Sequence, residues 1–284
     1  MGDTMEKLIF LDIDGTLTQM LAPPSRRVTR AIREARANGH RAFLCTGRNP
    51  PIITPDILEI GFDGMVASAG SYVEVEGRVL YDDVLPEKTV QECLAVFHGV
   101  GIYCRLEARE GIYTDAGMEA LVRSSGQDPQ NSELLRMQAE LDSNLPLRPY
   151  DEYPRQGAYK ISFTAPGPEP IQKAEQILGE RFAFVVHNFY PDSSCLNGEI
   201  IRRDVGKDHG MELICRYYGQ TAADTVAFGD SLNDAPMLQY AGIGVAMGNA
   251  SPEVKALADR VCESVEQDGI YWEFRRMGFC GETG

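Results

Sequence analysis

Short apolar runs that end in polar residues constrain the fold of this chain more than any other feature. Leu8–Ile13 is a largely apolar run, and "HRAFLC" and "DGMVAS" follow it at short intervals. Such runs are typical of strands buried on both faces. Between the first two lies "SRRVTRAIREARANG", which has apolar residues at helical spacing, Ser25 as its expected N-cap and Gly39 at its end. Strands that alternate with helices indicate βαβ units and a parallel sheet.

The pattern changes after the third of these strands. The segment "SYVEVEGRVLYD" alternates around Glu76-Gly77 and predicts a β-hairpin. Residues 86–189 then mix helices with strands, as expected for a separate α+β module of usual domain size. The helices expected there are Lys88–Phe97 and Glu169–Leu178, the strands are Ile102–Glu107, Tyr159–Thr164 and Phe182–Val186, and the loops are Ser124–Gln130 and Pro146–Gln156.

The strand–helix alternation resumes near Gly206. "GKDHGMELICRYYG" predicts a helix, "DTVAFGD" a strand, "NDAPMLQYAG" a short helix and "IGVAMG" another strand. The sequence therefore predicts an α/β core built from residues 1–85 and 190–284, which is interrupted by the module of residues 86–189.

Composition and charge restrict the functional classes. The net charge of −15 disfavours nucleic acid and anionic membrane surfaces as partners. No apolar run is long enough to span a membrane, and the first residues lack the pattern of a secretion signal. The seven cysteines are odd in number and form no C-x-x-C, so we expect reduced thiols in a cytoplasmic protein. The oligomeric state stays open.

Three polar signatures follow directly on predicted strands. They are Asp12-x-Asp14, Thr46-Gly47-Arg48 and Gly229-Asp230. Ligands of an open parallel sheet bind at the carboxyl ends of its strands, so one sheet gathers all three signatures at one edge. Lys207 opens a helix between the second and third signatures and is expected to reach the same edge.

The spacing of the acidic residues predicts a metal site. Residues i and i+2 of a strand point the same way, so Asp12 and Asp14 both project past the strand end, and Gly15 lets the backbone turn. Asp230 and Asp234 add two more carboxylates. Such a cluster requires a compensating cation, and oxygen ligands of this kind suit Mg²⁺.

The remaining polar residues fit phosphoryl transfer. Lys207 supplies a positive charge for phosphate oxygens, Thr46 a hydroxyl and Gly47 an exposed backbone N–H. One carboxylate can act as the nucleophile, and the other can act first as an acid and then as a base. Each motif alone is also compatible with a turn, a helix cap or a surface side chain. Their occurrence in this order, after successive strands, favours a catalytic site.

These motifs resemble those of the haloacid-dehalogenase-like phosphohydrolases, in particular the Cof-type subfamily. The resemblance covers roughly residues 1–85 and 190–275 and implies a Rossmann-like core, with the inserted module as its α+β cap domain. The four motifs are matched by "FLDIDGTLT", "LCTGR", "VGKDHG" and "AFGDSLNDAPML", and the later part by "AGIGVAMGNASPEVKALADRV" and "DGI".

The resemblance implies roles for the acidic residues. Asp12 is expected to be the nucleophile that forms an aspartyl-phosphate, and Asp14 to protonate the leaving alcohol and then activate water. The Mg²⁺ ligands are expected to be the Asp12 carboxylate, the Asp14 carbonyl and Asp230, with Asp234 in support. The activity implied is hydrolysis of small phosphorylated metabolites, with sugar phosphates as the favoured class.

The resemblance assigns the phosphate to Thr46, Gly47, Lys207 and Asn233. One departure is visible, because the family usually has Asn-Gly past the third core strand, whereas this chain has Ser68–Ser71. An asparagine contact cannot be carried over to that position, and the leaving group bound there can differ.

Two alternatives remain open at this point. One is a phosphomutase of the same fold, and the other is a non-catalytic phospho-ligand-binding regulatory protein. The cap is the expected selector of substrate, and its polar residues worth testing are Arg105, Glu107, Lys160, His187 and Asn188.

Overall fold

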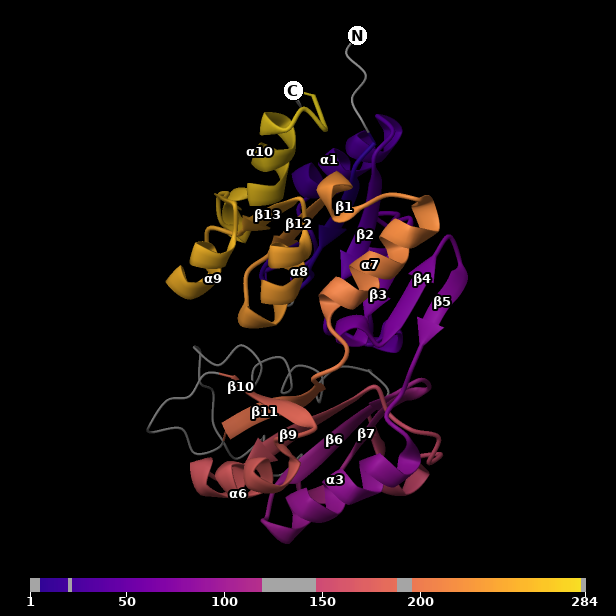
Figure 1. Cartoon of the computed structure of the whole chain (residues 1–284), viewed down its shortest axis with the longest axis vertical. Coiled ribbons are helices and arrows are strands. Elements are labelled where there is room, and N and C mark those ends of the chain that lie inside the picture. The colour runs from indigo at the N-terminus through magenta and orange to yellow at the C-terminus, as the bar shows by residue number, and fades with distance from the viewer. Residues whose placement is uncertain (1–5, 20–21, 119–146, 188–195, 282–284) are drawn as a thin grey trace. The chain divides into compact units, whose positions relative to one another are not determined.

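The computed structural model describes residues 6–19, 22–118, 147–187 and 196–281 (Figure 1). The chain folds into two compact units, each with its own sheet. The first unit comprises residues 1–48, 53–82 and 205–284, and the second comprises residues 49–52 and 83–204.

The first unit contains an eight-stranded sheet in the order β14-β13-β12-β1-β2-β3-β4-β5. Neighbouring strands from β14 to β3 run parallel, and β4 and β5 form the predicted antiparallel hairpin. Glu76 and Gly77 at its turn have φ values of 50° and 77°, as a two-residue hairpin of this type requires. The strands are β1 (Leu8–Leu11), β2 (Arg41–Cys45), β3 (Gly64–Ala67), β4 (Tyr72–Val75), β5 (Arg78–Asp82), β12 (Thr225–Gly229), β13 (Ile243–Ala246) and β14 (Arg260–Val261).

Helices cover both faces of this sheet (Figure 1). The alternation of β1 shows the two layers: Ile9 and Leu11 are buried in the cluster that contains α1 and α10, whereas Leu8 and Phe10 are buried with α7, α8 and α9. The side chain of Ser25 caps α1 as predicted, accepting a hydrogen bond from the N–H of Val28 at 3.1 Å. The helices are α1 (Arg26–Ala37), α2 (Pro55–Leu58), α7 (Lys207–Tyr218), α8 (Ala235–Tyr240), α9 (Pro252–Leu257) and α10 (Gly269–Arg276).

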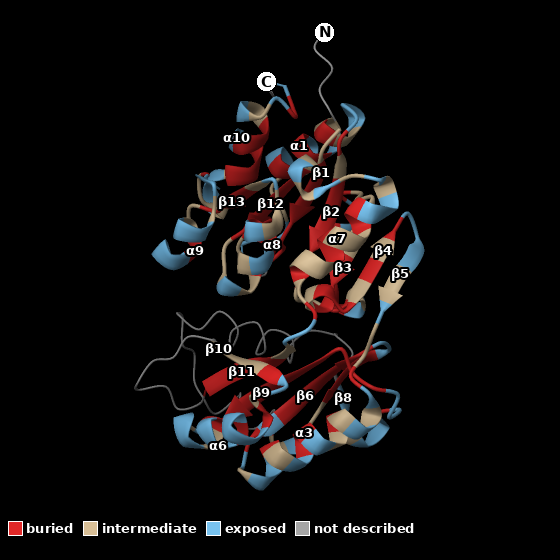
Figure 2. Cartoon of the chain, in the orientation of Figure 1, coloured by how far each residue is buried: buried red, intermediate tan, exposed pale blue. Residues whose placement is uncertain are grey.

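The second unit contains a six-stranded sheet in the order β10-β11-β9-β6-β7-β8. Its pairs are antiparallel except for β7 and β8. The helices α3 (Glu87–Gly99) and α6 (Pro168–Leu178) share one apolar core with the sheet. Figure 2 shows that β6, β9 and β11 are buried along most of their length. The strands are β6 (Tyr103–Ala108), β7 (Gly111–Thr114), β8 (Leu147–Pro149), β9 (Lys160–Ala165), β10 (Phe182–His187) and β11 (Leu196–Arg202).

The structure differs from the sequence analysis at two strands. β8 lies in the stretch Pro146–Gln156, so the prediction of a continuous loop there was wrong. The proline Pro149 ends this edge strand, where no further ladder hydrogen bond is required. β11 had been counted with the core from residue 190 onward, but it lies between β10 and β9, so the chain leaves the second unit at residue 204. The expected loop Ser124–Gln130 lies outside the described residues.

In the part of the chain that the structure describes, no helix combines the length and the apolar character needed to cross a membrane.

The helix α7 approaches β3 closely at Gly210. A Cβ atom added there would lie 2.3 Å from Cγ1 of Val66, which is closer than van der Waals contact allows. The glycine therefore lowers the intrinsic helix propensity but lets the helix pack directly on the strand. Because α7 begins at Lys207, this close approach also determines where the lysine lies relative to the strand ends.

We predict that Gly210→Ala destabilises the protein. The gain in helix propensity is about 1 kcal/mol, whereas overpacking a core costs about 1–3 kcal/mol, so the free energy of unfolding in urea should fall. The control is Gly99→Ala at the end of α3, where nothing lies within 4 Å of the added Cβ, and it should be neutral or slightly stabilising. The double variant Gly210→Ala with Val66→Ala should lose less free energy of unfolding than the two single variants lose together. If the two losses simply add, the added Cβ does not contact Val66.

Candidate functional site

Asp12 lies directly after β1 and is buried, with 5% of its surface exposed. Its N–H donates to the carbonyl of Phe228 at 3.1 Å, which continues the pairing of β1 with β12 for one more residue. Leu8 and Phe10, which have the same parity, face the layer that contains α7. Alternation along β1 therefore directs the Asp12 carboxylate toward α7, where it meets the side chain of Lys207.

The loop after Asp12 turns at Gly15. Gly15 has a φ of +85° and donates its N–H to the carbonyl of Thr18 at 2.9 Å. A Cβ atom at this position would lie 2.2 Å from a carboxylate oxygen of Asp230. The glycine is thus required twice, once by the backbone conformation and once by the carboxylate that packs against it. The loop also supplies Thr16, whose hydroxyl donates to Asp230 Oδ1 at 3.1 Å.

Lys207 is the first residue of α7 and is 1% exposed. Its Nζ donates to Asp12 Oδ1 at 2.7 Å and to Asp234 Oδ1. The lysine therefore bridges a carboxylate that follows β1 and a carboxylate at the start of α8. A buried charge of this kind is tolerated only when it is paired with opposite charge.

The charges of this cluster do not balance. Burial opposes the charge on Lys207, but Asp12 and Asp234 outweigh it and raise the pKa of the lysine. Burial and the neighbouring Asp234 also raise the pKa of Asp12 well above its ordinary value, although Lys207 acts in the opposite sense. Burial and Asp234 likewise raise the pKa of Asp230 to about 7. One lysine thus leaves an excess of negative charge among these carboxylates.

Asp234 is completely buried and its two oxygens are both engaged. Oδ2 accepts hydrogen bonds from the N–H groups of Asp230 and Ser231, each at 3.0 Å, while Oδ1 accepts from Lys207. Asp234 therefore holds the backbone at the end of β12 in place. Asn233 lies beside Gly47, because a Cβ added to that glycine would be 3.8 Å from the Asn233 amide nitrogen.

Carboxylate oxygens of Asp12, Asp230 and Asp234 all lie within 4.8 Å of one another. Two observations fit a divalent cation here: the ligands are oxygens, and burial together with the neighbouring Asp234 carboxylate raises the pKa of Asp12 and Asp230. Asp12 and Asp230 are the better direct ligands, because the oxygens of Asp234 are held by the Lys207 ammonium and by two backbone N–H groups. Among the described residues, those of Asp230 accept only from the Thr16 hydroxyl at 3.1 Å and from the Asn249 amide at 3.4 Å. Oxygen donors of this kind suit hard divalent cations, of which Mg²⁺ is one.

The loop Thr46–Arg48 follows β2 and is held through its backbone. The Thr46 N–H donates to the carbonyl of Val66 at 2.8 Å, and the Thr46 hydroxyl accepts from the Arg48 N–H at 3.1 Å. The guanidinium of Arg48 then makes a bidentate ion pair with Asp14, with Nε–Oδ2 at 2.9 Å and Nη2–Oδ1 at 2.6 Å. The Asp14 carboxylate therefore contacts Arg48.

A left-handed turn after β3 contacts this loop. Ser68 and Ala69 have φ values of 51° and 53°, which side chains other than Asn and Gly rarely adopt. Their N–H groups donate to the carbonyls of Arg48 at 2.8 Å and Thr46 at 3.0 Å. Gly70 follows with a φ of 103°, and a Cβ there would lie 2.1 Å from the carbonyl oxygen of the residue before Lys207. The turn thus abuts both the Thr46–Arg48 loop and the start of α7.

The structure brings most of the expected site residues to one edge of the sheet. Asp12, Asp230, Asp234 and Lys207 are in mutual contact or close to it, and Gly47 lies beside Asn233. The sequence analysis assigned no role to four residues that contact this group. They are Thr16, Arg48, Ser231 and Asn249, of which Asn249 donates to the Gly15 carbonyl at 2.8 Å. All four residues stood inside the quoted stretches, but only the fold shows their partners.

A second group of potential metal ligands consists of His98, Cys104 and Asp115 in the second unit. Here Asp115 Oδ2 already has two partners, His98 Nε2 at 2.7 Å and the Cys104 N–H at 2.7 Å. Burial raises the pKa of the Cys104 thiol well above its ordinary value, which disfavours the thiolate that binds metals. This group is explained as a structural contact.

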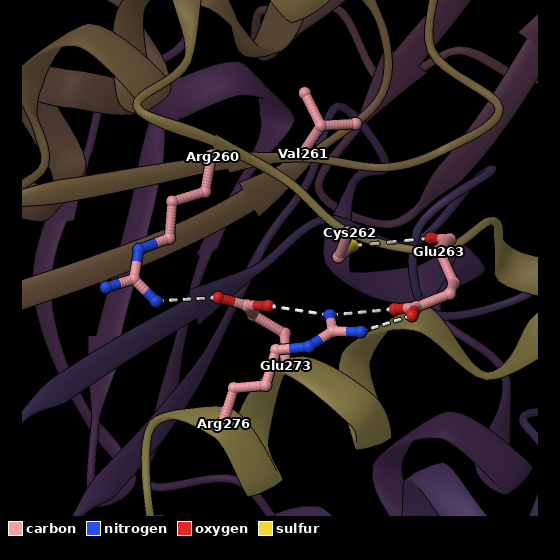
Figure 3. A pocket seen from close by; sticks show the side chains of 6 residues that line it. All are labelled: Arg260, Val261, Cys262, Glu263, Glu273 and Arg276. Carbon is pink, nitrogen blue, oxygen red and sulfur yellow. Dashed lines mark hydrogen bonds and ion pairs between the residues drawn. The ribbon is translucent and has the colours of Figure 1, made fainter.

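A pocket of about 520 Å³ lies beside β14 and α10 in the first unit (Figure 3). Its buried Glu273 lies between Arg260 at 2.9 Å and Arg276 at 3.0 Å, and Arg276 also pairs with Glu263 (Figure 3). These charges cancel pairwise. The pocket contains none of the predicted site residues, and its ion pairs are sufficient to explain its polar lining.

Comparison with known proteins gives concordant results. A model of the haloacid dehalogenase-like hydrolase family matches residues 9–274. The Bacillus subtilis protein YkrA is 29% identical over 275 residues, which cover 96% of this chain and 98% of YkrA. The HMP-PP phosphatase of Yersinia pestis is 27% identical over 256 residues, which cover 88% of this chain and 87% of the relative.

The fold is shared with solved structures. That of the phosphatase BT1666 from Bacteroides thetaiotaomicron superposes with a TM-score of 0.77 at 24% sequence identity, and the match covers 98% of this chain and 97% of BT1666. At 24% sequence identity this similarity supports a shared fold only.

Asp230 should make the stability of the metal-free protein depend on pH. Its pKa is about 7 in the folded protein and 3.8 in its unperturbed state, so folding disfavours the ionised form. In EDTA the free energy of unfolding should therefore decrease as the pH rises through this interval. At 1.36 kcal/mol per pKa unit the loss amounts to at most about 4 kcal/mol. Asp230→Asn should lack this loss, and the comparison of urea denaturation at pH 5 and pH 8 measures the upper part of it, about 3 kcal/mol.

Added Mg²⁺ should raise the stability of the unmodified protein at pH 8, and it should do so much less in Asp230→Asn. The exposed Asp56→Asn serves as the charge-matched control and should respond to Mg²⁺ like the unmodified protein. If Asp230→Asn and the unmodified protein show the same pH dependence and the same Mg²⁺ response, Asp230 neither carries the raised pKa nor binds the ion.

Proposed function

The chain belongs to the haloacid dehalogenase-like hydrolases, and on that premise we propose that it is a Mg²⁺-dependent phosphomonoester hydrolase. It acts on small phosphorylated metabolites through an aspartyl-phosphate intermediate. The first unit is its catalytic core and the second unit is its cap.

One observation carries the proposal: the buried Lys207 bridges Asp12 and Asp234 at the carboxyl ends of the parallel strands. The lysine keeps a positive charge beside the Asp12 carboxylate, where a phosphoryl group would be attacked. A purely structural role would not require an excess of carboxylates around one buried lysine, because each uncompensated charge costs stability.

The two aspartates of the first motif have different roles in this proposal. In the first step Asp12 attacks the phosphorus atom, and Asp14 donates a proton to the oxygen of the departing alcohol. In the second step Asp14 accepts a proton from water as the water oxygen attacks the phosphorus atom. The bond to Asp12 then breaks, inorganic phosphate leaves, and both carboxylates return to their starting states.

The remaining residues hold the phosphate and the metal. Thr46, Gly47, Lys207 and Asn233 bind the phosphoryl oxygens. The carboxylates of Asp12 and Asp230 and the carbonyl of Asp14 would hold Mg²⁺, and Asp234 supports them. When bound, the ion supplies positive charge that neutralises the carboxylates and the phosphoryl oxygens.

The substrate class follows from the family and from a relative. A sugar phosphate is the first class to test. The relative named HMP-PP phosphatase adds HMP-PP as a second candidate substrate. Free metabolites of this kind fit a cytoplasmic enzyme, and the acidic net charge of the chain disfavours nucleic acid as a substrate.

The cap offers a polar face that supports a role in selecting the substrate. One face of its sheet carries the apolar residues that pack against α3 and α6. The opposite face carries buried polar residues on three adjacent strands. They are Arg105 and Glu107 on β6, Lys160, Ser162 and Thr164 on β9, and Asn197 and Glu199 on β11.

Charged groups on this face contact one another. Lys160 Nζ lies 2.7 Å from Glu199 Oε2 and 3.3 Å from Glu107 Oε1, and the Ser162 hydroxyl donates to Glu107 Oε1 at 3.3 Å. Buried ion pairs of this kind add little stability compared with apolar packing, so their presence favours a functional role. Three of the five expected cap residues, Arg105, Glu107 and Lys160, thus lie together on this face. Asn188 and the side chain of His187 are outside the described residues.

The two aspartates can be separated by the leaving group. Asp12→Asn should be inactive on every ester, because an amide oxygen is a poor nucleophile. Asp14→Ala should lose about 10²–10⁴-fold in the first step with a sugar phosphate, whose alkoxide must be protonated. It should lose far less with p-nitrophenyl phosphate, since nitrophenolate departs without a proton. The aspartyl-phosphate should then accumulate, because the second step lacks its base.

Rapid-quench measurement of the nitrophenolate burst and of protein-bound phosphate tests this assignment. EDTA should abolish turnover in the unmodified protein, and Mg²⁺ should restore it. Equal first-step losses on both esters with no trapped phosphate would remove Asp14 as the acid and base. Full turnover by Asp12→Asn would refute the proposed function.

A single isosteric change tests the cap. Among the described residues the completely buried hydroxyl of Thr164 has no hydrogen-bond partner. Thr164→Val should therefore leave the free energy of unfolding equal or higher, yet it should change the ranking of phosphorylated metabolites by kcat/KM. The control is Lys173→Ala on the exposed side of α6, which should change neither. An unchanged ranking for Thr164→Val, with p-nitrophenyl phosphate turnover intact, would exclude this hydroxyl from substrate selection.

A further inference from the structure

We propose that Arg48 is a positioning residue that aims the Asp14 carboxylate at the leaving-group oxygen and at the attacking water. The inference rests on the proposed function, in which Asp14 is the acid and base. It assigns to Arg48 a role distinct from binding the phosphoryl group.

The Asp14 side chain requires such a partner. It lies on the loop after β1 and is 40% exposed, whereas Asp12 is almost completely buried. A carboxylate exposed to this degree has little packing to select one rotamer. The two parallel hydrogen bonds from Arg48 fix both its direction and its plane.

The Arg48 side chain is itself held in place. Only 11% of it is exposed, and its backbone is bound at both ends of the residue. Its N–H donates to the Thr46 hydroxyl, and its carbonyl accepts from Ser68 in the left-handed turn. The chain therefore maintains a backbone conformation unfavourable for Ser68 and Ala69, at about 1–2 kcal/mol for each residue, and this conformation fixes the base of Arg48.

The chemistry explains why orientation matters. The proton leaves Asp14 for the alkoxide oxygen in the first step and returns to Asp14 from water in the second. Arg48 exchanges no proton in either step. A displacement of about 1 Å in a reacting group can cost about 10²-fold in rate, so the loss of the guanidinium should impair proton transfer while phosphate binding persists.

The chain offers a matched control. Arg36 and Asp63 form a second bidentate pair within the first unit, with Nε–Oδ2 at 2.9 Å and Nη2–Oδ1 at 2.7 Å. This pair contacts none of the proposed catalytic residues in the described structure. Arg36→Gln therefore reports what the loss of such a pair does to stability alone.

The test compares Arg48→Gln, Arg48→Lys and Arg36→Gln on glucose 6-phosphate and p-nitrophenyl phosphate. Arg48→Gln should lose about 10–10²-fold in kcat on the alkyl ester and clearly less in the nitrophenolate burst, with KM little changed. Arg48→Lys should recover little, because an ammonium lacks the planar fork. In an Asp14→Ala background, Arg48→Gln should cause no further loss on either ester. Arg36→Gln should change stability without any dependence on the leaving group.

Other outcomes would contradict either the positioning role of Arg48 or the proposed hydrolase function. Equal losses on both esters, persisting in the Asp14→Ala background, would mean that Arg48 binds the phosphoryl group. Faster turnover by Arg48→Gln would mean that the ion pair restrains Asp14. Either result overturns the positioning role while leaving the hydrolase intact. An unmodified protein that hydrolyses neither ester nor any phosphorylated metabolite would overturn the proposed function itself.

Discussion

The ion pairs of Lys207 with Asp12 and Asp234 are the interaction on which the rest of this site depends. They connect the end of β1, the start of α7 and the start of α8 through one buried nitrogen. Removing one partner of a buried ion pair costs about 3–5 kcal/mol, because the other charge is left uncompensated. Two glycines make the geometry possible. Gly210 lets α7 pack on β3, and Gly229 leaves room for the Asp234 side chain, because a Cβ atom added to Gly229 would lie 2.5 Å from the Cβ of Asp234.

A second constraint links the motifs through the backbone. The left-handed turn Ser68–Gly70 binds the carbonyls of Thr46 and Arg48 and abuts the residue before Lys207. Strain in a sparsely populated backbone region persists only where the surrounding contacts determine it. Here the contacts are the hydrogen bonds to the predicted phosphate-binding loop Thr46–Arg48, so the strained residues are those that hold this loop in position.

The two units use their sheets in different ways. The central strands of the first sheet are apolar on both faces apart from Arg41 and Thr225 at their first positions, and the polar residues of the site stand past the strand ends. The cap sheet has one apolar face against α3 and α6 and one buried polar face. A polar face of this kind adds less stability than apolar packing, which makes it a better candidate for recognition than for folding.

Sequence alone determined the parallel core, because apolar strands alternating with amphipathic helices have few other ways to bury both faces. It also indicated Asp12, Asp230, Asp234 and Lys207 as one group, since carboxyl ends of parallel strands share an edge. It did not indicate β11 or the ion pair between Asp14 and Arg48. Only the tertiary structure decided these features, because β11 is defined by its pairing with β9 and β10 and the ion pair by the approach of two loops that are 34 residues apart in the chain.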